Sequence, residues 1–412
     1  MNDRAKVLVH APTDQFPMRA SMLTVGGIAL DRLAARVGQT PFYAYDRALL
    51  SRRVAELRAH LPESISLHYA MKANPMPAVV AHMAREVDGI DVASGGELRV
   101  ALDAGMDASE ISFAGPGKHA TELRQAIASG VLINVESPTE LATIARLAAE
   151  LDRPARVALR VNPDFELKSS GMKMGGGPKQ FGIDAETLPD LLRTIGAPLA
   201  FEGFHIFSGS QNLRADAIIE AQTKALELAT RLAAHAPGPV RTLNIGGGFG
   251  IPYFPGETRL DLGAVGRHLH GLVDDAKSAL PEAEIVVELG RYLVGEAGIY
   301  VARVIDRKVS RGQVFLVTDG GLHHHLSASG NFGQVIRKNY PVAIGTRAAD
   351  AEREIASVVG PLCTPLDLLA DRMDLARADI GDLVVVFQSG AYGLTASPGH
   401  FLSHPPAVEV LV

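Results

Sequence analysis

Hydrophobic and polar positions alternate regularly between about residue 65 and residue 290. Short apolar runs of strand length are separated by stretches such as 138–151 and 215–234, whose spacing indicates helices. Eight strands separated by helical crossovers predict a parallel sheet and favour a (β/α)8 barrel. An open, doubly wound sheet is the alternative. The eight apolar runs begin near Ile65, Gly89, Ile111, Val131, Arg156, Leu199, Thr242 and Ala283.

The pattern changes after about residue 295, where turn residues separate short apolar runs and the helical spacing ends. Such a pattern predicts a second, mostly β domain, which we expect to be a Greek-key-like barrel. We therefore predict a barrel domain over residues 42–290 and a β domain made of residues 1–41 and 291–412. The apolar runs of the β domain cover 300–305, 313–318, 354–359, 383–388 and 407–412.

Composition narrows the functional classes. The formal charge of −6 over 412 residues argues against a protein that binds nucleic acid electrostatically. Cys363 is the only cysteine, so an intrachain disulfide is excluded and a reducing cytoplasm is favoured. No run approaches 18 apolar residues, and the first residues lack the apolar core of a signal peptide, so no membrane association is expected.

In a barrel of this kind, functional residues lie at the C-terminal ends of the strands. Lys72 directly follows the mostly apolar run 65–70. A desolvated lysine has a lowered pKa, and its neutral amine can form a Schiff base with an aldehyde. The alternative is an ordinary solvated lysine.

Two further motifs end the seventh and eighth runs. The glycines Gly246, Gly247 and Gly248 leave backbone N–H groups unshielded, as a phosphate cradle requires, although a tight turn alone would also use them. After the eighth run, Glu288 can hold a protonated ring nitrogen and Arg291 can bind an anion, unless the two form a structural ion pair.

Other candidates carry a weaker signal. His205 and Phe207 share one face of the sixth run, and either can stack on a flat cofactor. Asn162 ends the fifth run, and residues 170–182 read as a glycine-rich loop over the mouth of the barrel. The triplet His323-His324-His325 is a poor metal site, because neighbouring side chains of a strand point to opposite faces, so no metal is expected.

Together and in this order, these motifs resemble the fold type III pyridoxal-phosphate decarboxylases, which include diaminopimelate and ornithine decarboxylases. The resemblance covers about residues 41–392. The amino-acid sequences of residues 203–211, 320–325 and 363–367 most resemble those of decarboxylases associated with exosortase and exopolysaccharide gene clusters. Those are related to enzymes that act on amino acids bound to a carrier protein.

The resemblance implies a role for each matching residue and a barrel that binds pyridoxal 5'-phosphate. Lys72 holds the cofactor as a Schiff base, and Cys363, entering from the partner subunit of a homodimer with shared active sites, returns a proton. Glu288 faces the ring nitrogen. The implied cofactor-binding residues are Lys72, His205, Ser208, Gly246, Gly247, Gly248, Glu288, Gly290, Arg291 and Tyr392. The implied substrate-binding residues are Arg291, Arg337, Tyr340, Cys363 and Tyr392.

The sequence departs from the family pattern at two places. Aligned on Gly209-Ser210, the family's stacking histidine is replaced by Phe207, which leaves that role open between Phe207 and His205. Enzymes that act on basic amino acids usually have an acid directly after the cysteine, whereas Thr364 stands here. This difference weakens the case for free diaminopimelate, ornithine or lysine as the substrate.

We therefore expect a pyridoxal-phosphate-dependent decarboxylase. The substrate amine displaces Lys72, and CO2 leaves from Cα of an amino acid that is free or carrier-bound. Diaminopimelate decarboxylase is one alternative. An amino-acid racemase on the same fold is another, but alanine racemases have an arginine at the ring nitrogen, where this chain has Glu288. A non-catalytic relative is disfavoured by the presence of Lys72, Cys363 and Glu288.

Overall fold

The computed structural model describes residues 9–166, 172–173, 175–334, 336–350 and 352–412, and it divides into two compact units. The barrel unit comprises residues 52–250 and 260–292. The β unit comprises the described residues up to Ser51, 251–259 and 293–412. Residues 42–51 thus group with the β unit, whereas the predicted barrel domain began at residue 42; the predicted domain limits stay a prediction.

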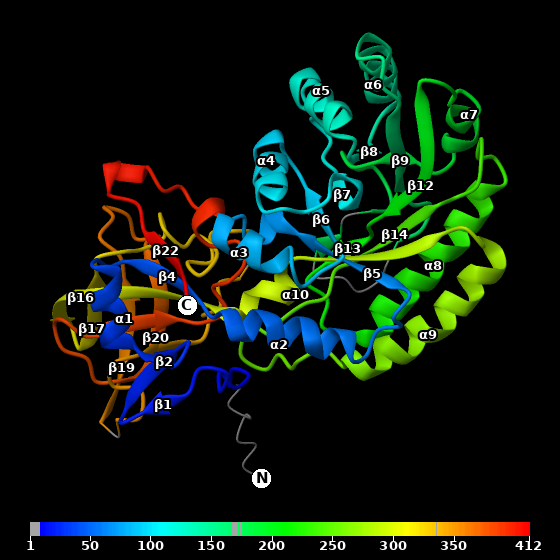
Figure 1. The fold of residues 1–412 in the computed structure, drawn as a ribbon. Coiled ribbons are helices and arrows are strands. Elements are labelled where there is room, and N and C mark those ends of the chain that lie inside the picture. The colour runs from blue at the N-terminus through cyan, green and yellow to red at the C-terminus, as the bar shows by residue number, and fades with distance from the viewer. Residues whose placement is uncertain (1–8, 167–171, 174, 335, 351) are drawn as a thin grey trace. The chain divides into compact units, whose positions relative to one another are not determined.

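Eight parallel strands close into a barrel in the barrel unit (Figure 1). Each strand pairs in parallel register with its neighbours, and β15 closes the ring against β5, with Glu288 opposite His68. The predicted eight strands and the barrel are confirmed. The strands are β5 (Ile65–Ala70), β6 (Gly89–Val92), β7 (Ile111–Phe113), β8 (Leu132–Val135), β9 (Ala155–Asn162), β12 (Leu199–Ile206), β14 (Thr242–Gly247) and β15 (Glu284–Leu289).

Among the described residues of the barrel unit, three short strands lie outside the ring of eight. β11 (Ile183–Asp184) extends the sheet in parallel beside β9, and β10 (Met172–Lys173) pairs antiparallel with β13 (Gly209–Ser210). Residues 170, 171 and 174 of the predicted glycine-rich loop lie outside the described residues.

Most of the helices follow a barrel strand and lie on the outside of the barrel (Figure 1). Hydroxyl caps begin two of them: Ser94 Oγ accepts from Glu97 N, and Ser137 Oγ accepts from Glu140 N. The helices are α2 (Arg47–Arg58), α3 (Pro77–Met83), α4 (Gly95–Asp103), α5 (Ala120–Ser129), α6 (Pro138–Glu150), α7 (Leu188–Leu192), α8 (Ala215–Ala233), α9 (Leu262–Ala279) and α10 (Arg291–Val294).

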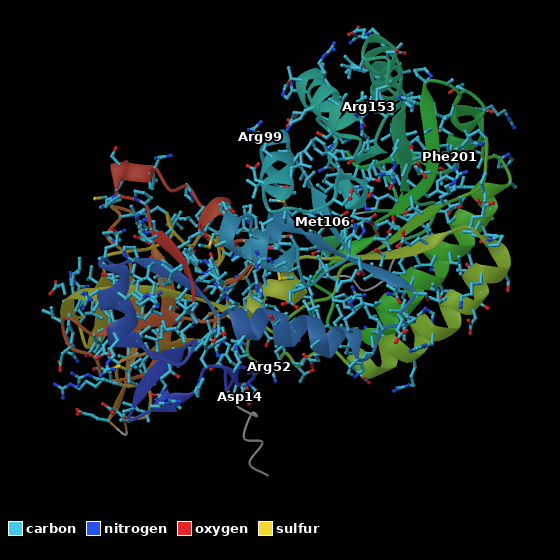
Figure 2. The ribbon with its side chains drawn as sticks, in the orientation of Figure 1. Asp14, Arg52, Arg99, Met106, Arg153 and Phe201 are labelled. Carbon is cyan, nitrogen blue, oxygen red and sulfur yellow. The ribbon has the colours of Figure 1, made fainter. Side chains whose placement is uncertain are left out.

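The side chains of the barrel unit follow the expected division between core and surface. Among those labelled in Figure 2, Arg99 on α4 and Arg153 are exposed, whereas Met106 and Phe201 are buried. Within the described part of the chain, no helix combines the length and the apolar character needed to cross a bilayer.

The β unit is built around the long strand β16 (Gly298–Ser310). Its first part pairs with β4 (Phe42–Tyr45) and β21 (Leu383–Val386), and its second part pairs with β17 (Gln313–Thr318). Further strands are β1 (Met18–Arg19), β2 (Met22–Val25), β3 (Ile28–Ala29), β18 (Val342–Ile344), β19 (Arg353–Val359), β20 (Leu368–Ala376) and β22 (Val408–Leu411), with one helix, α1 (Leu30–Val37). The mostly β character is confirmed, but β18 and β20 were not predicted.

Candidate functional site

Lys72 lies in the short 3-10 helix η1 (Met71–Ala73), directly after β5. Met71 and Ala73 are buried, but the Lys72 side chain is 46% exposed. Its Nζ is 3.7 Å from Glu288 Oε1 and 5.7 Å from the centre of the Phe207 ring. A desolvated lysine was expected at this position. The structure instead has a half-exposed amine whose charge faces a buried carboxylate.

Glu288 lies in β15, and only 6% of its surface is exposed. Its Oε2 is 2.9 Å from His205 Nε2 and accepts a hydrogen bond of 3.2 Å from Asn244 Nδ2. An ionised carboxylate can only accept, so His205 Nε2 carries the hydrogen in this contact. Oε2 is therefore held by two donors, while Oε1 faces Lys72.

The charge state of Glu288 results from a competition. Burial alone would raise the pKa of Glu288, but the charge and hydrogen bond of His205, together with the charges of Lys72 and Arg160, hold this pKa well below its ordinary value. The carboxylate therefore stays negative despite its burial. A fixed negative charge beside an accessible amine is suited to holding a cationic ring.

Asn244 joins this carboxylate to the glycine loop, residues 246–248. Its Nδ2 donates to Glu288, and its Oδ1 accepts from Gly246 N at 2.8 Å. Asn244 was not among the predicted site residues. The available signal was a polar residue two positions before Gly246 in an otherwise apolar strand.

The glycine loop requires glycine on steric grounds. Gly246 has φ of +71° and Gly248 has φ of +70°, which is the left-handed region that side chains disfavour. A Cβ atom on Gly247 would collide with the carbonyl oxygen of Glu288, and one on Gly248 with that of Gly209. The backbone of the loop thus approaches its neighbours more closely than any other residue would permit.

His205 and Phe207 have different surroundings. His205 is 1% exposed, and its Nε2 is bound to Glu288. Phe207 lies beyond the end of β12, is half-buried, and turns its ring toward Lys72 and Gly246. The geometry favours Phe207 as the stacking ring and His205 as a partner of Glu288, and the stacking role stays a prediction.

The remaining predicted residues of the barrel unit line the same region or support it. Ser208 borders a small cavity together with Gly247 and Gly248. A side chain on Gly290 would collide with Ala70 O, so this glycine lets the end of β15 pack against the end of β5. Arg291 opens α10.

Asn162 lies at a strand end, as predicted, but it organises a loop. Its Oδ1 accepts from Gly176 N, and its Nδ2 donates to Gly177 O and to Asp184 Oδ1. Its side-chain hydrogen bonds are therefore with residues 176–184.

Four predicted residues belong to the β unit, and their roles at the cofactor stay predictions. Cys363 is exposed in the segment between β19 and β20. Arg337 donates to the carbonyl oxygens of Ser329 and Leu368. Tyr340 is buried in an aromatic cluster, 4.6 Å from the Tyr253 ring, and Tyr392 adopts a φ of +52°.

The histidine triplet also lies in the β unit. His325 is buried, its Nε2 is 2.9 Å from Ser389 Oγ, and its Nδ1 accepts from Ala328 N. Burial lowers the pKa of His325 to about 3, so the ring is neutral. Among the described residues, no three His, Cys, Asp or Glu side chains are grouped as metal ligands would be.

Comparison with known proteins gives a consistent result. Residues 47–295 match the family described as pyridoxal-dependent decarboxylase, pyridoxal binding domain. The chain is 40% identical over 380 residues to L-glutamyl-[BtrI acyl-carrier protein] decarboxylase of Niallia circulans. The matched region covers 90% of this chain and 89% of the relative. It is 32% identical over 398 residues to diaminopimelate decarboxylase of Aquifex aeolicus, covering 96% and 91%. The crystal structure of diaminopimelate decarboxylase from Helicobacter pylori complexed with L-lysine matches with a TM-score of 0.81 and 26% identity, covering 93% of this chain and 94% of that one.

Proposed function

The chain belongs to the pyridoxal-dependent decarboxylase family, and we propose that Lys72 holds the cofactor. We also propose that the substrate is an amino acid carried by an acyl-carrier protein. The family assignment makes the protein an amino-acid decarboxylase that depends on pyridoxal 5'-phosphate. The roles of individual residues and the carrier are our proposals.

The barrel residues fit this cofactor. Glu288 keeps its charge in a buried position with Oε1 directed to the side of Lys72, which suits a protonated ring nitrogen. The glycine loop carries no side chains that would shield its backbone N–H groups from an anion. Phe207 offers an aromatic face beside Lys72. We propose that these groups hold the ring nitrogen, the phosphate and the ring face.

The chemistry divides between the cofactor and the chain. Bound pyridoxal phosphate supplies an electron sink for the pair left at Cα when CO2 departs. Lys72 Nζ would hold the cofactor until a substrate amine enters the site. Glu288 Oε1 would keep a proton on the ring nitrogen, and His205 and Asn244 orient the carboxylate.

We propose that Cys363 returns a proton to Cα and that it acts in the site of a second copy, so that the enzyme is a homodimer with shared sites. Its exposure supports this role. A thiol with this function must stay reduced, so we place the protein in a reducing compartment such as the cytoplasm.

The assignment of Lys72 is tested by reducing the holoenzyme with borohydride and mapping the labelled peptide. We expect the label on Lys72 and none on Lys118, a lysine of the same unit. Lys118 is buried and donates to Gly115 O, Asn134 O and Glu140 Oε1. A label on another lysine would refute the assignment.

The loop that carries Cys363 is the observation that supports the substrate proposal. Thr364 stands where enzymes of basic amino acids have an acid, and its Oγ1 accepts from Leu366 N. The next acid along the chain, Asp367, is buried and accepts from Leu322 N at 2.6 Å and Leu362 N at 2.8 Å. Neither residue therefore offers a carboxylate to a distal ammonium group.

The distal end of the substrate would instead be a thioester to a carrier. The identity of 40% to a decarboxylase of a carrier-bound glutamyl group, against 32% to a diaminopimelate decarboxylase, supports this choice. We propose a glutamyl group on an acyl-carrier protein as the first candidate.

A direct test is CO2 release from free glutamate, free diaminopimelate, free lysine and a glutamyl group on an acyl-carrier protein. We expect kcat/KM for the carrier-bound group to exceed that for each free amino acid by at least about 100-fold, or about 2.7 kcal/mol. Equal or faster turnover of free diaminopimelate would overturn the substrate proposal and leave the decarboxylase assignment intact.

The dimer proposal is tested by mixing two inactive variants, Lys72→Ala and Cys363→Ala, under conditions that allow subunits to exchange. Half of the dimers formed would be hybrids with one intact site of two, so about a quarter of wild-type activity should return. Absence of recovery after proven exchange would contradict shared sites.

A further inference from the structure

A small cavity lies between the glycine loop and α8. Its volume is about 20 Å³, and its lining includes Ser208, Gly209, Gly247 and Gly248 together with Gln222 of α8. A cavity that offers about 10–15 Å³ to a water-sized probe can hold one water molecule, provided that polar groups surround it. The cavity therefore has room for one ordered water.

Gln222 is an unusual residue for this place. Only 2% of its surface is exposed, and within the described structure neither Nε2 nor Oε1 has a hydrogen-bond partner. The other buried residues of α8, such as Ile218 and Ala225, are apolar. A buried amide without partners destabilises a fold, so native proteins almost always satisfy such groups, often with water.

Protein groups hold the glycine loop at two points. Gly246 N donates to Asn244 Oδ1, and Gly248 O accepts from Asn212 N at 2.9 Å. Asn212 also borders the cavity, and Gln222 is the buried polar residue that α8 contributes to its lining. A water bound to Gln222 would add a third point of support.

We propose that Gln222 holds an ordered water in this cavity and, through it, positions the glycine loop to receive the phosphate of pyridoxal phosphate. The inference rests on the proposed role of Gly246, Gly247 and Gly248 as the phosphate site. Gln222 is thus a positioning residue. Its effect reaches the cofactor through the loop and concerns the phosphate end only.

The test compares two ligands that differ only in the phosphate. The full-length protein is freed of cofactor, and the dissociation constants of pyridoxal phosphate and pyridoxal are measured for wild type and for Gln222→Met. Methionine has a similar length but cannot hold the water. We expect the dissociation constant of pyridoxal phosphate to rise about tenfold and that of pyridoxal to stay unchanged. Gln222→Glu, which places a negative charge beneath the anion, should weaken pyridoxal phosphate further.

Leu232→Ala is the matched control, because Leu232 is buried on α8 but lies outside the cavity. It should lower the melting temperature and leave the ratio of the two dissociation constants at its wild-type value. If Gln222→Met leaves both constants unchanged, or raises both equally, the proposal is overturned. If wild type itself binds pyridoxal as tightly as pyridoxal phosphate, the phosphate role of the glycine loop fails, and the proposal fails with it.

Discussion

Two buried glutamates of the barrel unit, Glu136 and Glu288, are each 6% exposed and lie at or near strand ends. Their surroundings differ. Glu136 Oε1 accepts from Arg160 Nη1 at 2.7 Å and from Gly115 N, and its Oε2 accepts from Gly182 N. Oε1 is thus bound by a permanent cation and a main-chain donor, and Oε2 by a main-chain donor.

Glu288 is satisfied on one side only. His205 and Asn244 bind Oε2, whereas Oε1 faces the half-exposed amine of Lys72 at 3.7 Å. The Glu136 carboxylate binds the main chain of two loops. The Glu288 carboxylate directs one oxygen toward a lysine that a ligand can reach. Burial alone does not distinguish the two acids. The distribution of donors over their two oxygens does, and it is the basis on which we propose a functional role for Glu288 and a structural one for Glu136.

The largest effect should follow from Glu288→Gln. The amide is nearly isosteric but carries no negative charge, so nothing keeps a proton on the ring nitrogen. We expect kcat for CO2 release to fall by about 1000-fold or more, or about 4 kcal/mol, while the far-UV circular dichroism spectrum stays that of wild type. A variant that retains a tenth of wild-type kcat would show that Glu288 resembles Glu136 in being structural.

Glu136→Gln should instead destabilise the protein. Removing this charge leaves the Arg160 guanidinium buried and unpaired, because its side chain is only 9% exposed. We expect a loss of about 3 kcal/mol in the free energy of unfolding, measured by urea denaturation of the cofactor-free protein.

A surface ion pair provides the control for that measurement. Glu150 contacts Arg124 and Arg146, and all three side chains are exposed. Glu150→Gln should leave the urea midpoint unchanged within error. An equally small effect for Glu136→Gln would show that the Glu136 carboxylate does not stabilise the fold.

The sequence predicted the barrel well because its alternation is strong and its strands end in recognisable motifs. Lys72, the glycine loop and Glu288 could be proposed as site residues because each ends a clear apolar run. The strand β20 escaped because Asp371, Arg372 and Asp374 interrupt its apolar pattern, and β18 escaped because it has only three residues.

The partners of Glu288 were harder to predict. Asn244 is 44 residues from Glu288 in the chain, and only the pairing of β14 with β15 brings the two together. His205 was predicted as a possible stacking ring, but its bond to Glu288 depends on the lateral order of the strands. Gln222 is not part of any recognisable motif. It stands out only in the structure, where it is a buried amide on an otherwise apolar helix face and has no hydrogen-bond partner among the described residues.

Asn244→Asp replaces the amide group that donates to Glu288 Oε2. The new carboxylate would lie beside Glu288, and a like charge raises the pKa of its neighbour. We expect kcat at pH 7 to fall about tenfold, because Glu288 Oε2 loses a donor, and the acidic limb of the kcat profile to move to higher pH. A pH profile parallel to that of wild type would show that Asn244 has no influence on the charge of Glu288.

The smallest expected effect concerns acid stability. The fold lowers the pKa of Glu288 below its ordinary value of 4.5, so the unfolded chain takes up a proton at this residue before the folded protein does. The ionised group therefore contributes stability that is fully present above about pH 4.5 and is lost as the pH falls below it. Between pH 4 and pH 3, the cofactor-free wild type should lose about 1 kcal/mol more stability than Glu288→Gln, which has no proton to take up.

Urea midpoints of both proteins at several pH values measure this difference. Other groups that titrate on the acid side, such as His325 with its pKa lowered to about 3 by burial, are common to both proteins and cancel in the subtraction. If the two stability curves run parallel below pH 4.5, Glu288 takes up its proton equally in the folded and unfolded states. His205, Asn244 and Lys72 would then not hold a charge on it, and the difference from Glu136 would be one of geometry alone.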